Sequence, residues 1–556
     1  MSRLSLLRTD DFTGGLNLRA DPFQLGRTES PDLLNVDIDP RGGLTMRGGM
    51  TKLNTSAIGS IANGSFTPKA LYAWDHSSPQ VLLSANSAVY YATTTAFTST
   101  GISTTAPFGA SFTAWSASTE SFAYVATGGV SYRWNGSTAT ALNDASAAYA
   151  DDYSSPVSGY APKARLITSH VDRLWCAHTT EGGVDYPNRV RFSHPINRES
   201  WATNDYIDIV EGGSGITAII PFNGNLLVFK KRAVFSILGY STDTFQVVNL
   251  TNEVGAVNPL SVVATEAAVY FFSWPDGLFK FDGQQFTDLF TSIRPLVQTG
   301  QVNDIAQGEI RVANVNHKIW VSLALGINTK ASACFIYDPS LKQSGAWSKY
   351  QTSDGKGLGS GCNFVTTTGT TYNLVCHPSN AYVLKVDQLS VYQDDVGTGA
   401  SNFSSYYTTP WQDANNVSNR KMWRRPDFVV KQTTVATDLT LRVYHDWEEA
   451  IVARSYVVSL DASGDSLIWN PVVGSLYNDV GFTYDNAGVL YDGNEPDGID
   501  GWNEADWGES ATGSALAVGK SLGLARSVQL SIQGEGGKPW GVNSITYKYN
   551  PRKVRA

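Results

Sequence analysis

SWPDGLFKFDG, residues 273–283, places a short aromatic strand between turn residues. Asp282-Gly283 supplies the positive φ angles of a tight hairpin, and Asn135-Gly136 does the same after the strand YRW. Related units recur about every 40 to 60 residues, as in SANSAVYY (84–91), ATGGVSYRWNG (126–136), FKKRAVFSILG (229–239), ASACFIYDP (331–339) and PSNAYVLKVD (378–387). A period of that length with several strands per unit predicts a β-propeller.

The repeats extend from about Tyr72 to Val386, and one more copy is expected near 188–193. We count seven blades. Six or eight stay open, because an N-terminal arm could add a strand or a unit could be split between the two ends. The expected fold class is therefore all-β, with a propeller as its main part.

Three regions follow from the change of pattern along the chain. Residues 1–50 are rich in Pro and Gly and predict an extended arm. Residues 51–395 hold the repeats. Residues 396–556 contain strictly alternating strands such as DLTLRVYHDW (438–447), which predict an antiparallel β-sandwich. Within it, the stretch 485–510 carries eight acidic residues and no Lys or Arg, so we expect an exposed acidic loop.

The composition limits the possible functions. Charged residues make up 16% of the chain and the net charge is −9. A negative chain is a poor candidate for neutralising nucleic-acid phosphates, although DNA can still slide past a weakly acidic wall. The start MSRLSLLRTDDF lacks the apolar stretch of a signal peptide, and no apolar run is long enough to span a membrane. We therefore expect synthesis in a cytoplasm.

Motifs for catalysis and cofactors are absent from the sequence, so we expect no enzyme and no cofactor. The nearest match to a sialidase Asp-box, Ser463-Asp465-Trp469, has Leu467 where glycine belongs. His170, Cys176 and His178 lack the fourth ligand that zinc needs. The cysteines are expected to be reduced, buried thiols, although two of them could face each other across a hairpin: Cys176, Cys334, and the possible pair Cys362 and Cys376.

Two sets of charges predict a contact between subunits. The first set is basic: Arg420, Lys421, Arg424 and Arg425, with a second basic cluster at Lys548, Arg552, Lys553 and Arg555. The other is the acidic loop: Asp492, Asp497, Asp500, Glu504 and Asp506. Opposite charges on neighbouring copies would set the register of a ring. A solvated charged face is the alternative, and a calcium site using Asp492, Asn494 and Asp497 is a further one, although its spacing departs from an EF-hand.

The arm, DDFTGGLNLRADPFQL (10–25) and ESPDLLNVDIDPRGGLTMRGG (29–49), resembles the N-terminus of the tail nozzle proteins of short-tailed bacteriophages, also called tail tubular protein B. The stretches VDRLWCAH (171–178), RVRFSHP (189–195) and ITAIIPFNGNLLVFKKRAVFSILG (216–239) are similar to the propeller of phage tail-hub proteins, and ARSVQLSIQGEGGKPWGVNSITYKY (525–549) to their closing sandwich. These motifs are loose patterns of Gly, Pro and aromatic residues that cover most of the chain.

The resemblance implies a structural virion protein of the phage tail. It implies a ring, most often a hexamer, that contacts tail adaptor and fibre proteins and lets phage DNA pass during ejection without reading its sequence. The family offers no catalytic residues to carry over. Two other classes stay open: a carbohydrate-binding tail spike or lectin-type propeller, and a propeller glycosidase, which would need two carboxylates at a set distance.

Overall fold

The computed structural model describes residues 4–116, 121–147, 149, 159–341, 345–388, 390–397, 399–431, 433, 435–460, 484–485, 488–489, 514–518 and 520–551. Strands dominate these residues, and the helices among them are single short turns: η1 (Ile58–Ser60), η2 (Ala145–Ala147), η3 (Pro259–Ser261), α1 (Pro295–Gln298) and η4 (Asp304–Glu309). None of the helices in this described part is long and apolar enough to cross a membrane. The all-β class expected from the repeats is confirmed.

A hairpin turn forms at Asp282-Gly283 as predicted, but only Gly283 of the pair has a positive φ, and the loop contains the four residues 282–285. Gly283 has a φ of 100°, which glycine adopts without a steric penalty. Asp282 Oδ1 accepts hydrogen bonds from the backbone N–H groups of Gln284 and Gln285, both at 2.9 Å. The turn joins β28 (Gly277–Phe281) to β29 (Phe286–Asp288), and Phe281 and Phe286 stack across it at 4.6 Å. Local turn chemistry and aromatic cross-strand pairing thus fix the register of this blade.

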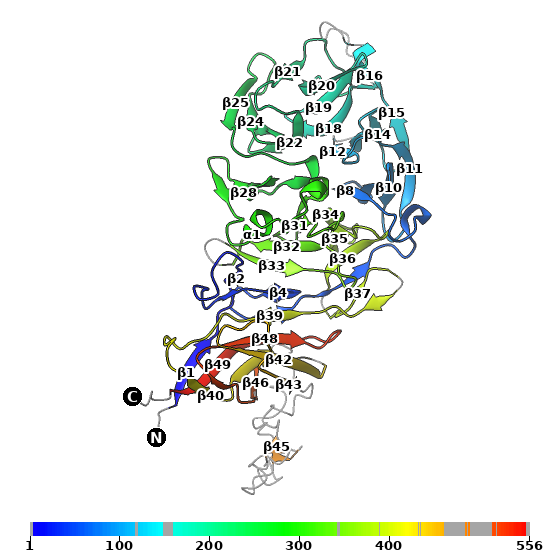
Figure 1. The fold of residues 1–556 in the computed structure, drawn as a ribbon. Helices are drawn as coiled ribbons and strands as arrows, with labels where there is room; N and C mark the ends of the chain where they lie inside the picture. The colour runs from blue at the N-terminus through cyan, green and yellow to red at the C-terminus, as the bar shows by residue number, and fades with distance from the viewer. Residues whose placement is uncertain are drawn as a thin grey trace, which may run out of the picture.

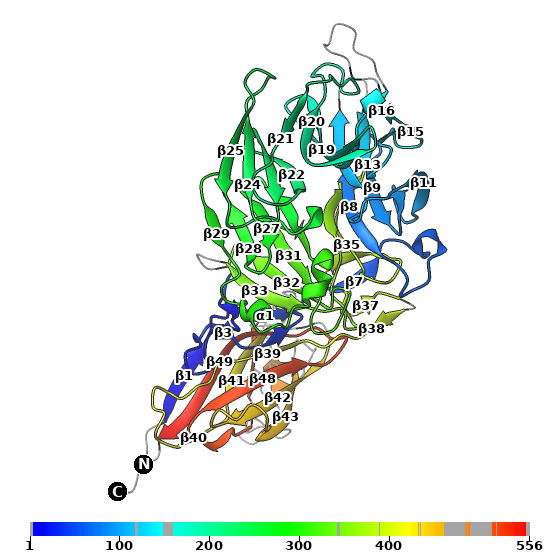
Figure 2. The same ribbon diagram turned by 45° about the horizontal axis from the view of Figure 1, so that its top comes forward.

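Six antiparallel sheets of four strands each and a seventh sheet of six strands form the propeller (Figures 1 and 2). The strands of the first three blades are β8 (Pro68–Trp74), β9 (Gln80–Ala85), β10 (Ala88–Ala92) and β11 (Thr98–Ser103); β12 (Ser111–Ser116), β13 (Ser121–Ala126), β14 (Tyr132–Trp134) and β15 (Ala139–Ala141); and β18 (Lys163–His170), β19 (Arg173–Glu181), β20 (Val184–Phe192) and β21 (Tyr206–Asp208). A short parallel pair, β16 (Asn143–Asp144) and β17 (Tyr160–Ala161), lies in the link between the second and third blades.

The remaining blades follow the same order. Their strands are β22 (Ile216–Phe222), β23 (Asn225–Lys230), β24 (Val234–Leu238) and β25 (Gln246–Thr251); β26 (Val262–Ala264), β27 (Val269–Ser273), β28 and β29; β30 (Arg311–Val315), β31 (Lys318–Leu323), β32 (Ala333–Asp338) and β33 (Ala346–Tyr350); and β34 (Gly361–Val365), β35 (Thr371–Cys376), β36 (Val383–Gln388) and β7 (Gly49–Lys52). The first strand of each blade contacts the first strand of the next, and β34 contacts β8. The ring of seven blades is therefore closed.

The arm supplies the strand that closes the last blade. Strand β7 pairs antiparallel with β36, with Lys52 opposite Leu384, and β37 (Asp394–Asp395) then lies parallel to β7. A Cβ atom at Gly49 would lie 2.3 Å from the carbonyl oxygen of Gln393, so only glycine allows this close approach. The seventh blade is extended further by β38 (Ala400–Ser401).

The sandwich uses both ends of the chain. One sheet has the order β46 (Ser514–Val518), β41 (Asp427–Lys431), β49 (Gly541–Pro551), β40 (Lys421–Trp423) and β47 (Gly523–Ala525), and the arm adds β1 (Ser5–Thr9), β5 (Val36–Ile38) and β6 (Leu44–Met46). The other has the order β4 (Leu33–Leu34), β39 (Tyr406–Thr408), β48 (Val528–Gly534), β42 (Thr437–His445) and β43 (Arg454–Leu460). Two further pairs are β2 (Gly15–Leu16) with β3 (Glu29–Ser30), and β44 (Tyr484–Asp485) with β45 (Gly488–Val489).

The arm packs on its own chain, since four of its strands belong to the sandwich and one to the propeller. Its residues 33–38 alternate apolar and polar side chains, and the apolar ones, Leu33, Val36 and Ile38, are buried. They join one hydrophobic cluster that also contains Trp347 of the propeller and Trp423 of the sandwich. A continuous core of this kind joins the two parts more firmly than a polar domain interface would.

We predict that Met50→Ala destabilises the protein by about 2–5 kcal/mol, the usual cost of truncating a buried large side chain to alanine. Met50 is 1% exposed in β7 and packs in a cluster with Leu384 and Val396. Urea denaturation followed by circular dichroism measures the change. Val365→Ala, at an exposed position of the same blade, is the matched control and should alter the unfolding free energy by less than about 0.5 kcal/mol. Equal effects of the two substitutions would contradict closure through β7.

Candidate functional site

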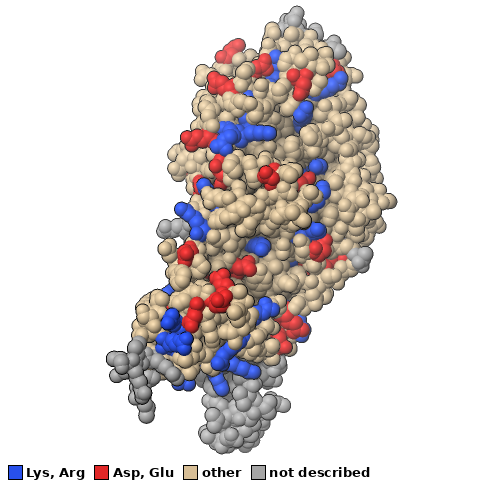
Figure 3. Space-filling model, in the orientation of Figure 1, with Lys and Arg blue, Asp and Glu red and all other residues tan. Residues whose placement is uncertain are grey.

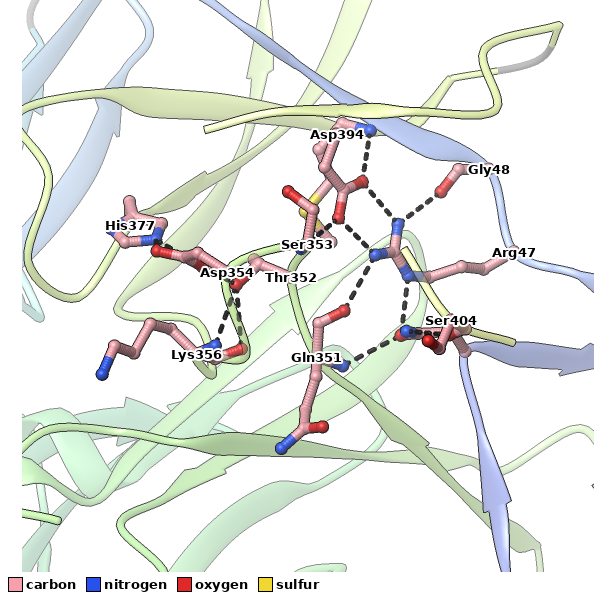
Figure 4. A network of polar contacts seen from close by, with 12 residues as sticks. Arg47, Gly48, Gln351, Thr352, Ser353, Asp354, Lys356, His377, Asp394 and Ser404 are labelled. Atoms are coloured by element: carbon pink, nitrogen blue, oxygen red, sulfur yellow. Dashed lines mark hydrogen bonds and ion pairs between the residues drawn. The ribbon is translucent and has the colours of Figure 1, made fainter. Parts of the chain in front are cut away.

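The chain passes between sandwich and propeller at two places, and a buried ion pair joins them. The first passage is residues 47–48, between β6 and β7, and the second follows the paired strands β37 and β38. Arg47 lies in the first passage and Asp394 begins β37. Their side chains are 1% and 0% exposed. The pair therefore lies at the point where arm, propeller and sandwich meet (Figure 4).

Every N–H group of the Arg47 guanidinium has an acceptor. Two parallel hydrogen bonds reach Asp394, from Nη1 to Oδ1 at 2.9 Å and from Nη2 to Oδ2 at 2.6 Å. The remaining donors bond to Gly48 O at 2.8 Å, Gln351 O at 2.9 Å and Asn35 Oδ1 at 2.9 Å. The ring of Phe403 lies against the guanidinium, 3.8 Å from Cζ to the centroid. A bidentate, fully hydrogen-bonded pair is the geometry in which a buried charge is tolerated.

The carboxylate of Asp394 is saturated as well. Its Oδ1 accepts the backbone N–H of Met50 at 3.1 Å, and its Oδ2 accepts that of Ser353 at 3.0 Å. Asn35, with a φ of 54°, donates from Nδ2 to Ser404 O at 2.7 Å and accepts the N–H of Gln351 at 2.9 Å. The network thus contacts the arm, the sixth blade, the seventh blade and the start of the sandwich. No donor or acceptor of the pair is left for a substrate, so its role is to hold these parts together.

A second polar pair lies beside this network in Figure 4. His377, which is fully buried, lies 3.1 Å from Asp354 through Nε2, and its Nδ1 accepts the backbone N–H of Asn380 at 2.8 Å. Burial would raise the pKa of Asp354, but the hydrogen bonds from His377 and Thr352 outweigh it and hold this pKa below its ordinary value. Both ring nitrogens are engaged, so His377 has no free nitrogen with which to act as a general base in this arrangement.

We predict that Arg47→Met and Asp394→Asn each destabilise the protein by about 3–5 kcal/mol, because each leaves a buried group without its partner. The double variant should be less destabilised than the sum of the two, since it removes both charges together. Denaturant titrations of all three variants measure this coupling. Arg232→Met, in an ion pair with Asp276 whose arginine is 51% exposed, is the control and should cost less than about 1 kcal/mol. Strict additivity of the two buried substitutions would contradict a coupled pair.

The structure brings the two predicted basic clusters together. Strand β40 pairs with β49, and the N–H of Arg424 donates to Lys548 O at 2.7 Å. We call the exposed residues Arg420, Arg424 and Arg425, together with Lys548, the basic edge of the sandwich. Figure 3 shows Lys and Arg side chains gathered over the sandwich. Lys548 also forms an ion pair with Asp427 at 2.6 Å, so part of the positive charge on this edge is balanced within the chain.

Lys421 differs from the expectation that it belongs to an exposed patch. It is 2% exposed, and Nζ donates to the carbonyl oxygens of Asn416, Asn419 (3.0 Å) and Arg526 (2.8 Å). Burial lowers the pKa of Lys421. The physical reason is the alternation of β40, which turns residues 421 and 423 to the inside and Arg424 to the surface. Its ammonium holds a loop and is not available to a partner.

The acidic half of the predicted contact lies outside the described residues. This holds for Asp492, Asp497, Asp500, Glu504 and Asp506, and for Arg552, Lys553 and Arg555 of the second basic cluster. The subunit contact therefore stays a prediction. The same holds for a calcium ion held by Asp492, Asn494 and Asp497.

Candidate metal-binding and catalytic side chains do not cluster in the described part of the chain. No three His, Cys, Asp or Glu side chains there are placed to hold a metal ion. Cys176 is buried, which raises the pKa of its thiol, while His178 pairs with Asp185 at 3.3 Å. All four cysteines are free thiols.

A cavity of about 730 Å³ lies between arm residues 14–29 and the fifth and sixth blades. Its wall carries charges of both signs, from Arg19, Asp21, Lys280 and Asp288.

The carboxyl group of Asp205 has a raised pKa. Burial moves it from 3.8 to about 6, and its Oδ2 has no hydrogen-bond partner. The sequence gives no sign of this group, because it lies in an ordinary polar loop between β20 and β21. A raised pKa can mark a catalytic acid, but glycoside hydrolysis needs a second carboxyl at a set distance. The direct consequence is a dependence of stability on pH.

We predict that Asp205→Asn stabilises the protein at pH 8 by up to about 3 kcal/mol and has little effect at pH 4. A carboxyl whose pKa is higher in the folded state holds its proton more tightly when folded. Its contribution to stability is therefore lost as pH rises from about 4 to about 6, and it stays lost above that range. Thermal unfolding of both proteins across this range measures the difference. A constant difference at every pH would show that the Asp205 carboxyl keeps its ordinary pKa in the fold.

Comparisons with known proteins found solved structures of low similarity. No family model and no curated protein match the chain. Two structures of the extracellular domain of a one-component or hybrid two-component system from B. thetaiotaomicron share 9% and 12% identity with it, at TM-scores of 0.37 and 0.39 over 67% and 76% of this chain. An ancestral GH74 enzyme shares 10% identity at a TM-score of 0.40 over 62%.

This chain spans 43% and 56% of the two extracellular domains and 53% of the GH74 enzyme. Likeness at this level carries no argument about function. The class of the protein rests instead on its own sheets: a seven-bladed β-propeller closed by an N-terminal strand and joined to a β-sandwich.

Proposed function

We propose that this protein is a structural subunit that assembles with copies of itself into a ring, as a tail nozzle or hub of a short-tailed phage does, with phage DNA passing through the centre of the ring. The observation that carries the proposal is a pair of open sheet edges on two distant blades. Such edges present unpaired N–H and C=O groups to a partner strand. The resemblance of the arm and repeats to tail nozzle proteins supports the same function.

The first open edge is β25 of the fourth blade. Its first four residues, Gln246 to Asn249, are all exposed. Val247 and Val248 point to opposite faces of the sheet, so their joint exposure means that neither neighbouring blade covers this strand. Protected edges carry charges or proline, and QVVNLT has neither. This strand is therefore suited to pair with another chain.

The second open edge is β11 of the first blade, which is also six residues long and uncharged, TSTGIS. Four of its residues are exposed. No described strand pairs with it beyond β10. The first and fourth blades are three apart, the greatest separation that a closed ring of seven allows, and β11 and β25 lie on opposite sides in both views of the ribbon (Figures 1 and 2). Pairing of β25 with β11 of the next copy is a heterologous contact, which closes into a ring by rotation.

The sandwich would strengthen such a ring. The basic edge would contact the acidic stretch 485–510 of a neighbouring copy, where charge complementarity sets register more than affinity. The core shared by sandwich and propeller would transmit load between the two parts as one rigid unit. A net charge of −9 per subunit is multiplied around a ring, and an acidic passage does not retain DNA. Tail adaptor and fibre proteins would then be further partners in the virion, and no step requires a bond to be made or broken.

We predict that the wild-type chain forms rings and that Val247→Lys with Val248→Lys leaves it monomeric, because charge on an edge strand opposes pairing. Light scattering gives the mass, and electron microscopy of the protein alone and mixed with tail components gives the shape. Val365→Lys, at an exposed position on β34, is the matched control and should assemble normally. Arg424→Glu with Arg425→Glu should weaken assembly in low salt.

These measurements test the formation of a ring separately from the two contacts proposed to hold it together. A wild-type chain that stays monomeric both alone and with tail components would contradict the proposed function. Rings that persist in the valine double variant would contradict the assignment of β25 while leaving the ring in place. Unchanged assembly of the arginine double variant would remove the charged contact in the same way.

A carbohydrate-binding protein is the second candidate, favoured by one group of aromatic side chains. Phe23, which is 64% exposed, lies 5.0 Å from Trp447 between ring centroids, and Trp447 lies 6.2 Å from Trp411. Trp411 Nε1 donates to Glu449 at 3.3 Å. Aromatic faces beside a carboxylate suit a sugar ring. A protein of this class would bind a glycan as an isolated subunit, whereas the ring subunit needs no glycan.

A further inference from the structure

A short helical turn contacts links on two distant sides of the propeller. This turn, η4, leads into β30, the first strand of the sixth blade. From one side, Asn258 Nδ2 donates to Gln307 O at 3.3 Å and to Ile310 O at 3.1 Å. From the other side, Phe108, in the link between the first two blades, lies against Gly308, 3.7 Å from the position of a Cβ atom there. Because links from both sides of the ring contact η4, this turn lies across one face of the propeller.

Three cationic side chains meet at the end of this turn. Lys69 comes from β8, Arg311 from β30 and Lys330 from the loop between β31 and β32. All three face the carboxylate of Glu309, with N···O distances of 3.7, 3.8 and 3.6 Å. These distances exceed those of a hydrogen bond. Three positive charges therefore face one negative charge, and none of the three is hydrogen-bonded to it.

The guanidinium of Arg311 is incompletely satisfied. It is 3% exposed, and Nη1 donates to Gly308 O at 2.6 Å and to Ile310 O at 3.0 Å. Its Nη2 is buried and has no hydrogen-bond partner. Buried donors without an acceptor are rare and cost stability, and those on a charged group cost the most. An acceptor beside Nη2 would complete the site.

The electrostatics of the cluster favour an added negative charge. Burial lowers the pKa of Lys69, and Arg311 and Lys330 lower it further, against the opposing effect of Glu309. Burial likewise lowers the pKa of Arg311. The charged forms of Lys69 and Arg311 are thus disfavoured in the fold. A bound anion would offset the excess of two positive charges.

We propose that Lys69, Arg311 and Lys330 bind a small divalent oxyanion, of the class of phosphate or sulfate, at the end of η4. Its oxygens accept from Arg311 Nη2 and from the two ammonium groups, which are charge-assisted hydrogen bonds of the strong type. A tetrahedral anion presents enough oxygens for all three donors, and its double charge matches the local excess. This site does not depend on the proposed ring.

The test uses the purified full-length chain with inorganic phosphate, sulfate and a phosphomonoester, each against chloride at constant ionic strength. Calorimetry and thermal unfolding measure binding, which stabilises the folded state in a saturable way. We expect Lys69→Met and Lys330→Met each to weaken binding about tenfold, the effect of one charge-assisted hydrogen bond. Glu309→Gln should bind more tightly than wild type, because it removes a repelling carboxylate.

The Glu309→Gln variant separates the proposal from a purely structural role. If Glu309 were only the counter-ion of the cluster, its loss would destabilise the fold without strengthening phosphate binding, and that result would overturn the proposal. Lys163→Met, in an ion pair with Asp144 at 2.8 Å on the third blade, is the control and should bind as wild type does. Saturable binding of any of the three anions supports the site. Binding of none of them, or equal stabilisation of every variant by the anions, contradicts it.

Discussion

The bidentate pair of Arg47 and Asp394 is the constraint on which the arrangement of this protein depends. The chain enters the propeller through residues 47–48 and leaves it after β38; Arg47 lies in the entry, and Asp394 lies in β37, shortly before the exit. Every hydrogen-bonding group of the pair is used, so neither crossing can shift without leaving a buried charge unpaired. The closure of the last blade and the position of the sandwich are fixed by the same contact.

Around this contact, the two parts of the protein form one continuous core. Residues of the arm pack against β33 of the sixth blade and against both sheets of the sandwich. An isolated propeller would expose this apolar surface, and an isolated sandwich would lack β1, β4, β5 and β6. We therefore expect the two to fold as one unit. A rigid subunit of this kind suits a mechanical role, in which load must pass between parts without hinge motion.

The fold could be predicted further from the sequence than the site could. Turn pairs such as Asp282-Gly283 act locally, so a single unit shows its own hairpin and the repeat shows the blades. Arg47 and Asp394 lie 347 residues apart, and no local pattern connects them. Near Arg47, the sequence shows only an arginine before two glycines, in the stretch TMRGG (45–49), and this does not identify its partner. The prediction that Lys421 is exposed failed for a related reason. Strand alternation buries one side chain of a basic run and exposes the next, and which of them is buried depends on the pairing of β40.

The use of an N-terminal strand to close the last blade has a consequence for synthesis on the ribosome. Strand β7 is made before all seven blades, but its partner β36 ends only at Gln388. While the blades are made, the nascent chain therefore carries an unpaired strand on one side of a growing row of blades. Premature pairing of that strand with another nascent chain would yield a swapped product, so a chain stalled before residue 388 is the form most exposed to misassembly.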